Sequence, residues 1–353
     1  VLLILAGITI NLTIGQDGII KRAQEAGETY KNVEANELAD MKTFEASLIP
    51  GRVAKTVEGV QYVGDGMGNL IPVPVGFSYL EGTKSTGFVI KNDIDGNEFV
   101  WVPCTIDGGN GSIKYDRYAF YREGWEAAQI LNNVNGEIIT KDEETLIFKE
   151  EIVNEEQNSI KIYSGFYIGR YEAGIESQEQ RNETSDASDD VVIQKDKNVY
   201  SYISFSDAKN ISEKLYTKEN NNVTSRLCSS YAWDTALKFI ETQNMSYATN
   251  SIGGNYKETK FTYKDIKGQI QIKQENVVTI VPTGQTKSMN NIYDMGGNVW
   301  EWLTENVSKN SKMYCSHRGG NAYDSATSHP AGFRYCSSDQ AYRGNGFRVT
   351  LFL

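Results

Sequence analysis

The sequence predicts an α+β protein in which a long N-terminal helix precedes a loop-rich domain. Helix-forming residues fill the stretch from residue 18 to residue 49, and no proline occurs in it before Pro50. From residue 51 on, short β-branched and aromatic runs alternate with glycine, asparagine and aspartate turns, which is typical of short strands. Two amphipathic helix patterns lie among these runs, and this mixture indicates an α+β domain.

The composition supports a folded chain and excludes several classes of function. The 353 residues are 39% hydrophobic and include 32 glycines and 21 tyrosines but only 6 prolines, so the chain can bury a sizeable core. The formal net charge of -11 repels phosphate backbones, and we expect no nucleic-acid partner. Four cysteines without a C-x-x-C pair and only 2 histidines argue against zinc and His-rich catalytic metal sites.

The first residues, VLLILAGITI, form an apolar run that ends near Gly15. This run is shorter than the roughly 20 residues of a membrane-spanning helix, so we interpret it as the end of a signal or membrane segment. A buried helix in a soluble core is the alternative. Asp17 is the expected cap of a helix that begins at Gly18, and the thin apolar stripe of this helix indicates a stalk or one-sided packing. The stripe comprises Ile20, Ala23, Tyr30, Leu38, Met41, Phe44 and Leu48.

The segment from VLLILAGITI to AQEA resembles the N-terminal helix of type IV pilin-like proteins of Gram-positive bacteria. In those proteins the apolar helix anchors the subunit in the membrane and can then pack into a filament. The resemblance implies that residues 1–50 form an anchor helix and stalk. It also implies an extracellular location at the cell surface, anchored in a membrane or pilus, with the membrane and other pilin-like subunits as partners.

The middle of the chain predicts short strands interrupted by surface insertions. VEGVQYVGDGMGNLIPVPVGFSYL and TGFVIKNDIDGNEFVWVPC are typical of strands, and Asp95-Gly96 is the expected turn of a hairpin. Residues 105–160 carry polar and acidic insertions, including KDEETLIFKEEIVNEEQNS, which we interpret as surface excursions. The closing run GFRVTLFL predicts a buried strand.

Two helices are predicted from apolar spacing. In SFSDAKNISEKLY the expected cap is Ser206, and in SSYAWDTALKFI it is Ser229 or Ser230. Apolar residues recur on one face of each predicted helix. These residues are Ala208, Ile211 and Leu215 in the first helix, and Trp233, Ala236, Leu237 and Ile240 in the second.

The most informative stretch is NNIYDMGGNVWEW at residues 290–302. Gly296 and Gly297 permit a tight turn, and Trp300 and Trp302 can bury a large apolar area, so the residues alone predict an aromatic corner of the core. The stretch also resembles the N-x-x-G-N-x-W-E-W signature of the formylglycine-generating enzyme (sulfatase-modifying factor) family.

Other segments of the chain match further landmarks of this family, in the family's order. The resemblance covers roughly residues 70–353 and implies a C-type-lectin-like fold with two helices, small twisted antiparallel sheets and much irregular backbone. We therefore expect one such domain over residues 51–353. The matching segments are the strands NEFVWVPC (97–104) and GFYIGRYEAG (165–174), the helices YSYISFSDAKNISEKLY (200–216) and SRLCSSYAWDTALKFI (225–240), and the closing HRGGNAY (317–323) and NGFRV (345–349).

Enzymes of this family oxidise a sulfatase cysteine to formylglycine and bind copper(I) through two C-terminal cysteines five residues apart. Cys336 aligns with the second of these, and Ala331 stands where the first is expected. Soft Cu(I) needs paired thiolates, so the resemblance implies no copper and no such catalysis, unless Cys315 approaches in space. The sequence holds no phosphate-binding glycine loop, G-x-S-x-G or H-E-x-x-H motif. We interpret His317 and His329 as ordinary surface or hydrogen-bonded residues.

The resemblance also implies a structural calcium site around the W-E-W motif. The family binds Ca²⁺ there through an Asn or Asp side chain, two backbone carbonyls and the Glu. The matching positions are Asp294, Gly297, Val299 and Glu301, and such hard oxygen ligands suit Ca²⁺. The alternative is that Asp294 and Glu301 only hydrogen-bond the backbone of the turn.

Residues 319–346, GGNAYDSATSHPAGFRYCSSDQAYRGNG, contain no Lys, Glu, Met, Trp, Leu, Ile or Val. Tyr, Ser, Asn and Gly dominate recognition loops, so this composition favours a binding segment, with a plain polar loop as the alternative. The variable proteins of diversity-generating retroelements share this kind of domain, and their variable segment lies between the G-G and G-F-R landmarks. Adenine mutagenesis of their AAY codons never produces Lys, Glu, Met or Trp. The segment fits that pattern if Gln340 is a fixed position.

The resemblance therefore implies a non-catalytic, surface-displayed ligand-binding protein, the variable protein of a diversity-generating retroelement. Its partner would be an unknown protein or carbohydrate on another cell, a phage or a host. A formylglycine-generating oxidase acting on a sulfatase cysteine and a structural minor pilin are the alternatives. The candidate contact residues are Asn321, Tyr323, Asp324, Ser325, Ser328, His329, Tyr335, Ser337, Asp339 and Tyr342.

Overall fold

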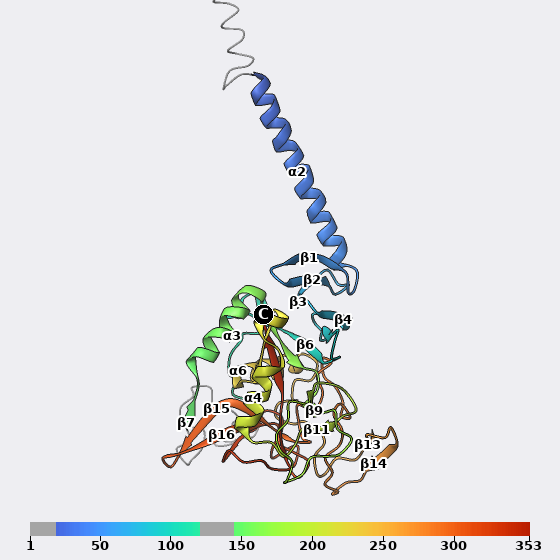
Figure 1. The fold of residues 1–353 in the computed structure, drawn as a ribbon, viewed down its shortest axis with the longest axis vertical. Helices are drawn as coiled ribbons and strands as arrows, with labels where there is room; N and C mark the ends of the chain where they lie inside the picture. Colours follow the sequence, from blue (N-terminus) through green and yellow to red (C-terminus); the bar gives the residue numbers. More distant parts are fainter. Residues whose placement is uncertain (1–18, 121–144) are drawn as a thin grey trace, which may run out of the picture.

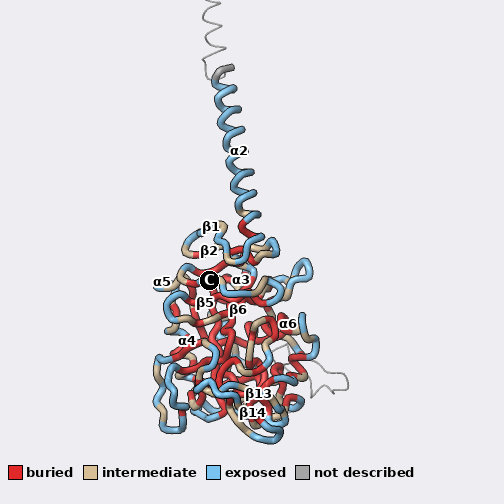
Figure 2. The backbone as a smooth tube through the Cα atoms, turned by 90° about the vertical axis from the view of Figure 1, so that its right-hand side faces the viewer, coloured by how far each residue is buried: buried red, intermediate tan, exposed pale blue. Residues whose placement is uncertain are grey.

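A long helix, α2 (Ile19–Ser47), extends from the domain formed by the rest of the chain (Figure 1). The computed structural model describes residues 19–120 and 145–353, so the apolar run and the expected Asp17 cap lie outside the described residues. The C-terminal end of α2 contacts the domain at its first two strands, and the apolar residues of the stripe from Ala23 to Leu48 are exposed (Figure 2). The predicted N-terminal helix is therefore confirmed over its described length. Within residues 19–120 and 145–353, no helix combines the length and apolarity needed to cross a membrane.

The first half of the domain consists of short antiparallel strands. Three of them form a small sheet at the foot of α2, and the predicted hairpin at Asp95-Gly96 joins β5 to β6. A six-stranded antiparallel sheet in the order β12-β19-β8-β6-β5-β4 forms the centre. The bounds are β1 (Val53–Val57), β2 (Val60–Gly64), β3 (Leu70–Pro74), β4 (Phe77–Glu81), β5 (Val89–Asn92), β6 (Glu98–Pro103), β8 (Gly165–Gly169), β12 (Thr224–Leu227) and β19 (Val349–Phe352).

A five-stranded sheet, in the order β17-β16-β15-β18 with β7 also paired to β15, lies toward the end of the domain away from α2 (Figure 1). Only the β15–β18 pair is parallel. Its bounds are β7 (Thr145–Ile147), β15 (Trp300–Lys309), β16 (Lys312–Arg318), β17 (Arg334–Ser337) and β18 (Asn345–Phe347). The remaining short elements are a 3₁₀ turn (Gly109–Gly111), β9 (Gly174–Ile175), β10 (Val191–Val192), β11 (Asn198–Val199), β13 (Phe261–Lys264) and β14 (Ile270–Lys273).

The closing run is buried as predicted, but it is not one strand. It divides at Arg348 into β18, which pairs with β15, and β19, which pairs with β8 and β12. The division follows from the polarity of Arg348, whose guanidinium turns into the domain to meet buried acceptors. The chain therefore passes from one sheet to the other at this residue.

The central sheet separates two hydrophobic cores. Because side chains alternate along a strand, Phe99 and Trp101 of β6 point into one core and Val100 and Val102 into the other. Helix α4 (Phe205–Leu215) covers the first core and α6 (Ser230–Glu241) the second, each through its apolar face. These two helices confirm the α+β class that the sequence predicts. A single short turn, α5 (Lys218–Asn221), follows α4.

The helix caps agree with the prediction only in part. Ser229 caps α6, since its hydroxyl accepts a hydrogen bond from the amide of Ala232 at 3.1 Å. The cap of α4 is Ser204 and not Ser206, because Ser204 Oγ accepts from the amide of Asp207 at 3.1 Å. Ser206 lies inside the first turn of the helix.

Helix α3 (Glu150–Tyr163) corrects the interpretation of residues 105–160 as surface excursions only. Glu156, Ser159 and Ile160 form a buried face with helical spacing, and acidic neighbours mask that face in the sequence. The hydroxyls of Tyr115 and Ser229 donate to Glu156 Oε2 at 2.6 and 2.9 Å. The buried acid therefore tethers α3 to the cap of α6.

We expect Glu156→Gln to remove part of the pH dependence of stability. Burial raises the pKa of Glu156 from 4.5 to about 7, so its stabilising contribution is complete below pH 4.5 and is lost as the pH rises through 7. As the pH rises, the unfolding free energy of the wild type should therefore fall relative to that of the variant, by at most about 3 kcal/mol. Urea unfolding between pH 5 and pH 8 checks this, with the exposed Glu151→Gln as the control. Parallel curves for wild type and Glu156→Gln would contradict it.

Candidate functional site

The W-E-W motif begins β15 and directs its side chains to two faces. Trp300 and Trp302 share one face, and Trp302 is fully buried with its indole N–H donating to the carbonyl of Ile203 at 3.0 Å. The prediction that both tryptophans belong to an aromatic corner of the core is confirmed. The turn before them requires glycine, because Gly297 has φ +78° and a Cβ there would meet the Asn255 carbonyl at 2.5 Å.

Glu301 lies on the other face of β15 and forms a buried ion pair with Arg348. Arg348 donates from Nε to Glu301 Oε2 at 2.9 Å and from Nη2 to Oε1 at 2.7 Å. The same guanidinium donates to the carbonyls of Gly169 and Tyr293 at 2.8 and 2.9 Å. Burial opposes the charge of Arg348, but the adjacent Glu301 carboxylate raises the pKa of Arg348 above its usual value. Burial raises the pKa of Glu301 and so opposes its charge, whereas the two hydrogen bonds from the Arg348 guanidinium favour the charged pair. The pair joins β15 to the central sheet.

Two further buried acids lie near this ion pair. The carboxylate of Asp294 accepts from the Thr286 hydroxyl and from the amide of Gly284, both at 2.6 Å. Glu172 accepts a hydrogen bond from Asn298 Nδ2, and its burial together with the nearby acids raises its pKa well above the usual value. Burial and the nearby acids thus favour the neutral form of Glu172.

This arrangement tests the calcium site implied by the sequence. Each oxygen of Asp294 and of Glu301 already accepts a hydrogen bond from the protein, and the cation beside Glu301 is Arg348. A second cation at the same carboxylate would meet the positive charge of that arginine. The two carboxylates thus do not fit an oxygen cage for Ca²⁺, and we derive no role for the ion. Calcium binding at Asp294, Gly297, Val299 and Glu301 is untested, and the arrangement of the two acids argues against it.

The candidate segment, residues 319–346, starts with a turn that uses two of the predicted contact residues internally. The amide of Asn321 donates to Asp324 Oδ2 at 3.0 Å, and the amide of Tyr323 donates to Asn321 Oδ1 at 2.9 Å. Asn321 is buried, so the structure does not bring its side chain to the surface. Asp324 shapes the turn and is half-buried.

The other candidate residues divide into exposed and half-buried groups. Tyr335 and Tyr342 are 55% and 52% exposed, and Ser328 and Asp339 are also exposed. Asp339 has a structural contact as well, since it accepts from the amide of Ser206 in the first turn of α4 at 3.2 Å. The half-buried candidates, besides Asp324, are Tyr323, Ser325, His329 and Ser337.

Five rings form an aromatic cluster beneath part of this segment: Trp300, His317, His329, Phe333 and Tyr335. The Trp300 ring lies 4.7 Å from that of His317, 5.6 Å from His329, 6.1 Å from Phe333 and 6.0 Å from Tyr335, between centroids. Strand pairing assembles the cluster, because β15, β16 and β17 lie side by side. The structure thus brings the candidates His329 and Tyr335 together around a residue outside the segment.

His317 corrects the expectation of an ordinary surface or hydrogen-bonded histidine. It is 3% exposed, and no residue in the described part of the chain hydrogen-bonds either of its ring nitrogens. Trp300, Trp302 and Tyr335 surround its ring, and this burial lowers its pKa from 6.5 to about 3. His317 is therefore a neutral imidazole. The sequence could not reveal this role, because it depends on which strands pair.

Strand pairing does not place Cys315 and Cys336 on one face. On β16 and β17, Cys336 lies opposite Ser316, and Cys315 lies opposite Ser337. Because adjacent residues of a strand face opposite sides, this register points Cys315 and Cys336 to opposite faces of the strand pair. Ala331 is fully buried, and its carbonyl accepts from the Trp233 indole at 3.0 Å.

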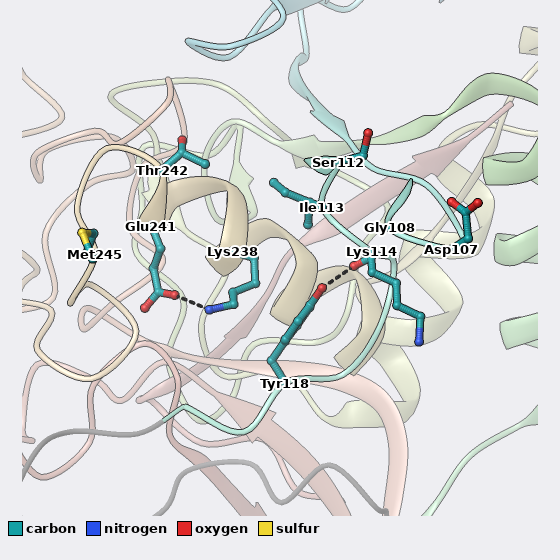
Figure 3. Close-up of a pocket in the computed structure, with 10 residues that line it drawn as sticks. All are labelled: Asp107, Gly108, Ser112, Ile113, Lys114, Tyr118, Lys238, Glu241, Thr242 and Met245. Carbon is teal, nitrogen blue, oxygen red and sulfur yellow. Dashed lines mark hydrogen bonds and ion pairs between the residues drawn. The ribbon is translucent and has the colours of Figure 1, made fainter. Parts of the chain in front are cut away.

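Two of the surface hollows differ in their relation to the candidate segment. One of about 510 Å³ borders the candidate segment at residues 325–327 and is closed on its other side by residues 252–261. A second, of about 580 Å³, lies between α6 and residues 107–118 and contains no candidate residue (Figure 3). In it Lys238 pairs with Glu241 at 2.9 Å, and the Tyr118 hydroxyl donates to the Lys114 carbonyl at 2.7 Å. The hollow beside the segment is the better candidate for ligand contact.

The ion pair predicts the response to calcium removal. Since Arg348 supplies the cation at Glu301, we expect excess EGTA to leave the Tm unchanged. Arg348→Met should lower the unfolding free energy by about 3–5 kcal/mol, because it leaves a buried carboxylate without its partner. The exposed Arg343→Met serves as the matched control and should change it by at most about 0.5 kcal/mol. A fall in Tm on chelation that added Ca²⁺ reverses would reinstate the metal site.

Comparison with known proteins identifies the domain. A family model described as a sulfatase-modifying factor enzyme 1-like domain matches residues 136–351, well over half of the chain. No curated protein matches the sequence. Among solved structures the chain is similar to PvdO from Pseudomonas aeruginosa (15% identity, 75% of this chain and 98% of that chain, TM-score 0.38). It is also similar to CarF (15%, 74% and 100%, 0.41) and to Treponema denticola variable protein 1 (14%, 86% and 94%, 0.20). The chain therefore belongs to the family of sulfatase-modifying factor enzyme 1-like domains, as its sequence motifs predict.

Proposed function

We propose that this protein is a non-catalytic, surface-displayed ligand-binding protein and the variable protein of a diversity-generating retroelement. The observation that carries the proposal is the candidate segment, which lacks Lys, Glu, Met and Trp and lies between the two glycines at 319–320 and the G-F-R run. Tyr335 and Tyr342 of this segment expose half of their side chains, as a recognition surface requires.

Burial within the segment supports tolerance to variation. Its inward positions include Ala322, Ala326 and Ala331, which are buried and small. Positions such as Ser328 and Tyr342 are exposed, and substitutions at exposed positions usually change stability by at most about 0.5 kcal/mol. The frame can then stay the same while the contact face changes. The ligand would be a protein or carbohydrate on another cell, a phage or a host.

The N-terminal part suggests how the domain is displayed. Helix α2 leaves the domain with its described apolar stripe exposed, and β15 and β16, which pair next to the candidate segment, lie toward the opposite end (Figure 1). An anchor at α2, in a membrane or among pilin-like subunits, would direct the binding face outward from the cell. We therefore include extracellular, membrane- or pilus-anchored display in the proposal. The net charge of -11 argues against nucleic acid as the ligand.

Sequencing this gene from many sibling cells tests diversification directly. We expect substitutions to be confined to residues 319–346, to concentrate at the exposed candidate positions, and never to introduce Lys, Glu, Met or Trp. Ala331 and the flanking glycines should stay constant, because their space is filled by the core. A neighbouring reverse transcriptase and a near-copy of the 3′ end would accompany the variation. A constant segment, or variation spread evenly along the gene, contradicts the proposal.

The oxidase alternative makes the opposite prediction for catalysis. We expect no conversion of a sulfatase cysteine peptide to formylglycine by the copper(I)-treated protein, because the two thiols of β16 and β17 face opposite sides. Mass spectrometry of the peptide measures this, with an authentic formylglycine-generating enzyme as the positive control. Conversion by the wild type that disappears in Cys336→Ser would establish the enzyme instead.

A further inference from the structure

The aromatic cluster has a layered arrangement. Trp300 and His317 belong to β15 and β16, outside the candidate segment, and are 7% and 3% exposed. Tyr335 belongs to the segment, is 55% exposed, and places its ring 6.0 Å from that of Trp300 and 5.6 Å from that of His317. The tyrosine therefore covers two buried rings whose positions are set by the frame.

The covered layer has hydrogen-bonding capacity that no described residue uses. Both ring nitrogens of His317 lack a partner, and so does the buried hydroxyl of Ser337, which the strand register places on the same face. A buried polar group without a partner costs about 1–3 kcal/mol, so such a group normally bonds to ordered water or to a ligand. His317 is neutral and can donate from one nitrogen and accept at the other.

We propose that Trp300 and His317 form the floor of a ring-binding subsite, and that Tyr335 occupies the subsite in this sequence. The residue at position 335 then decides whether the floor is open. A small residue there, such as Ser, Asn or Ala, uncovers the floor and admits a planar aromatic side chain of a protein partner. With Tyr335 present, its own exposed ring face contacts the partner instead. The inference rests on the proposed function, because it assumes that position 335 varies while the floor does not.

The chemistry of the walls favours an aromatic ring over a sugar. His329 and Phe333 stand beside Trp300, with interplanar angles of 81° and 57° to its ring, so the opening would be lined by ring faces and edges. Aromatic rings pack well in such edge-to-face surroundings. A sugar presents several hydroxyls, whereas the buried polar atoms without a partner at this floor are the ring nitrogens of His317 and the hydroxyl of Ser337. The subsite therefore matches a ring with at most one or two polar atoms.

Tyr335→Ala tests the subsite, with phenol as the probe and methyl glucoside as the comparison. The matched control is Tyr342→Ala, since Tyr342 is similarly exposed and is not one of the five rings of the cluster. We expect Tyr335→Ala to red-shift tryptophan emission and increase acrylamide quenching, and Tyr342→Ala to change neither. Phenol should reverse both effects and bind Tyr335→Ala at least about tenfold more tightly than the wild type. Tyr335→Phe should behave as the wild type.

The outcomes separate this inference from the proposed function. Circular dichroism and the Tm first establish that Tyr335→Ala is folded, and the double variant His317→Phe/Tyr335→Ala should retain the emission shift but lose phenol affinity. Unchanged emission in folded Tyr335→Ala, or equal phenol binding by the wild type, would overturn the subsite. Preference for methyl glucoside would overturn its ligand class. None of these results depends on sibling-cell sequencing, which alone decides whether position 335 is diversified.

Discussion

The buried ion pair between Arg348 and Glu301 is the constraint on which the rest of this domain depends. It joins the strand of the W-E-W motif to the end of the chain and, through the carbonyl of Gly169, to the central sheet. Loss of either partner leaves an uncompensated buried charge, so the register of β15 is fixed. With Glu301 held on one face, Trp300 must lie on the other, beneath the candidate segment. The buried ion pair between Arg348 and Glu301 thus fixes the position of Trp300 beneath the candidate segment.

The same frame holds both ends of the candidate segment. At its start, the carbonyl of Gly319 accepts from the hydroxyl of Tyr256 at 2.8 Å and from the amide of Gly297 at 2.9 Å. At its end, β18 pairs with β15, and the amide of Trp300 donates to the carbonyl of Gly344 at 2.7 Å. A loop with both ends fixed loses little order when the side chains between them change. This separation of frame from contact face is what a diversified binding protein needs.

The sequence predicted the helices and turns that depend on interactions between residues close together in the chain. Apolar spacing located α4 and α6, and a turn dipeptide located the hairpin at Asp95-Gly96, because helix faces and tight turns are encoded within a few residues. Helix α3 escaped prediction because Glu156, a charged residue type, occupies its buried face, where its Oε2 accepts from two distant hydroxyls. These hydroxyls belong to Tyr115 and Ser229, which lie far from Glu156 in the sequence. The same limit explains His317 and Arg348, whose roles follow from strand pairing.

Composition identified a candidate surface but not the task of each residue in it. Asn321 and Asp324 have the residue types of recognition loops, yet those same polar groups build the turn after Gly320. The match to the family's W-E-W motif likewise did not reveal the role of Glu301. A sequence match cannot show that Arg348 hydrogen-bonds this carboxylate. The position expected to carry a copper ligand is Ala331, which packs in the core against Trp233. A copper site needs two thiolates converging on one point, whereas a recognition face needs only exposed side chains on a rigid support. Once Ala331 is committed to the core, this loop retains the support and the exposure but not the convergence, and that favours binding over oxidation.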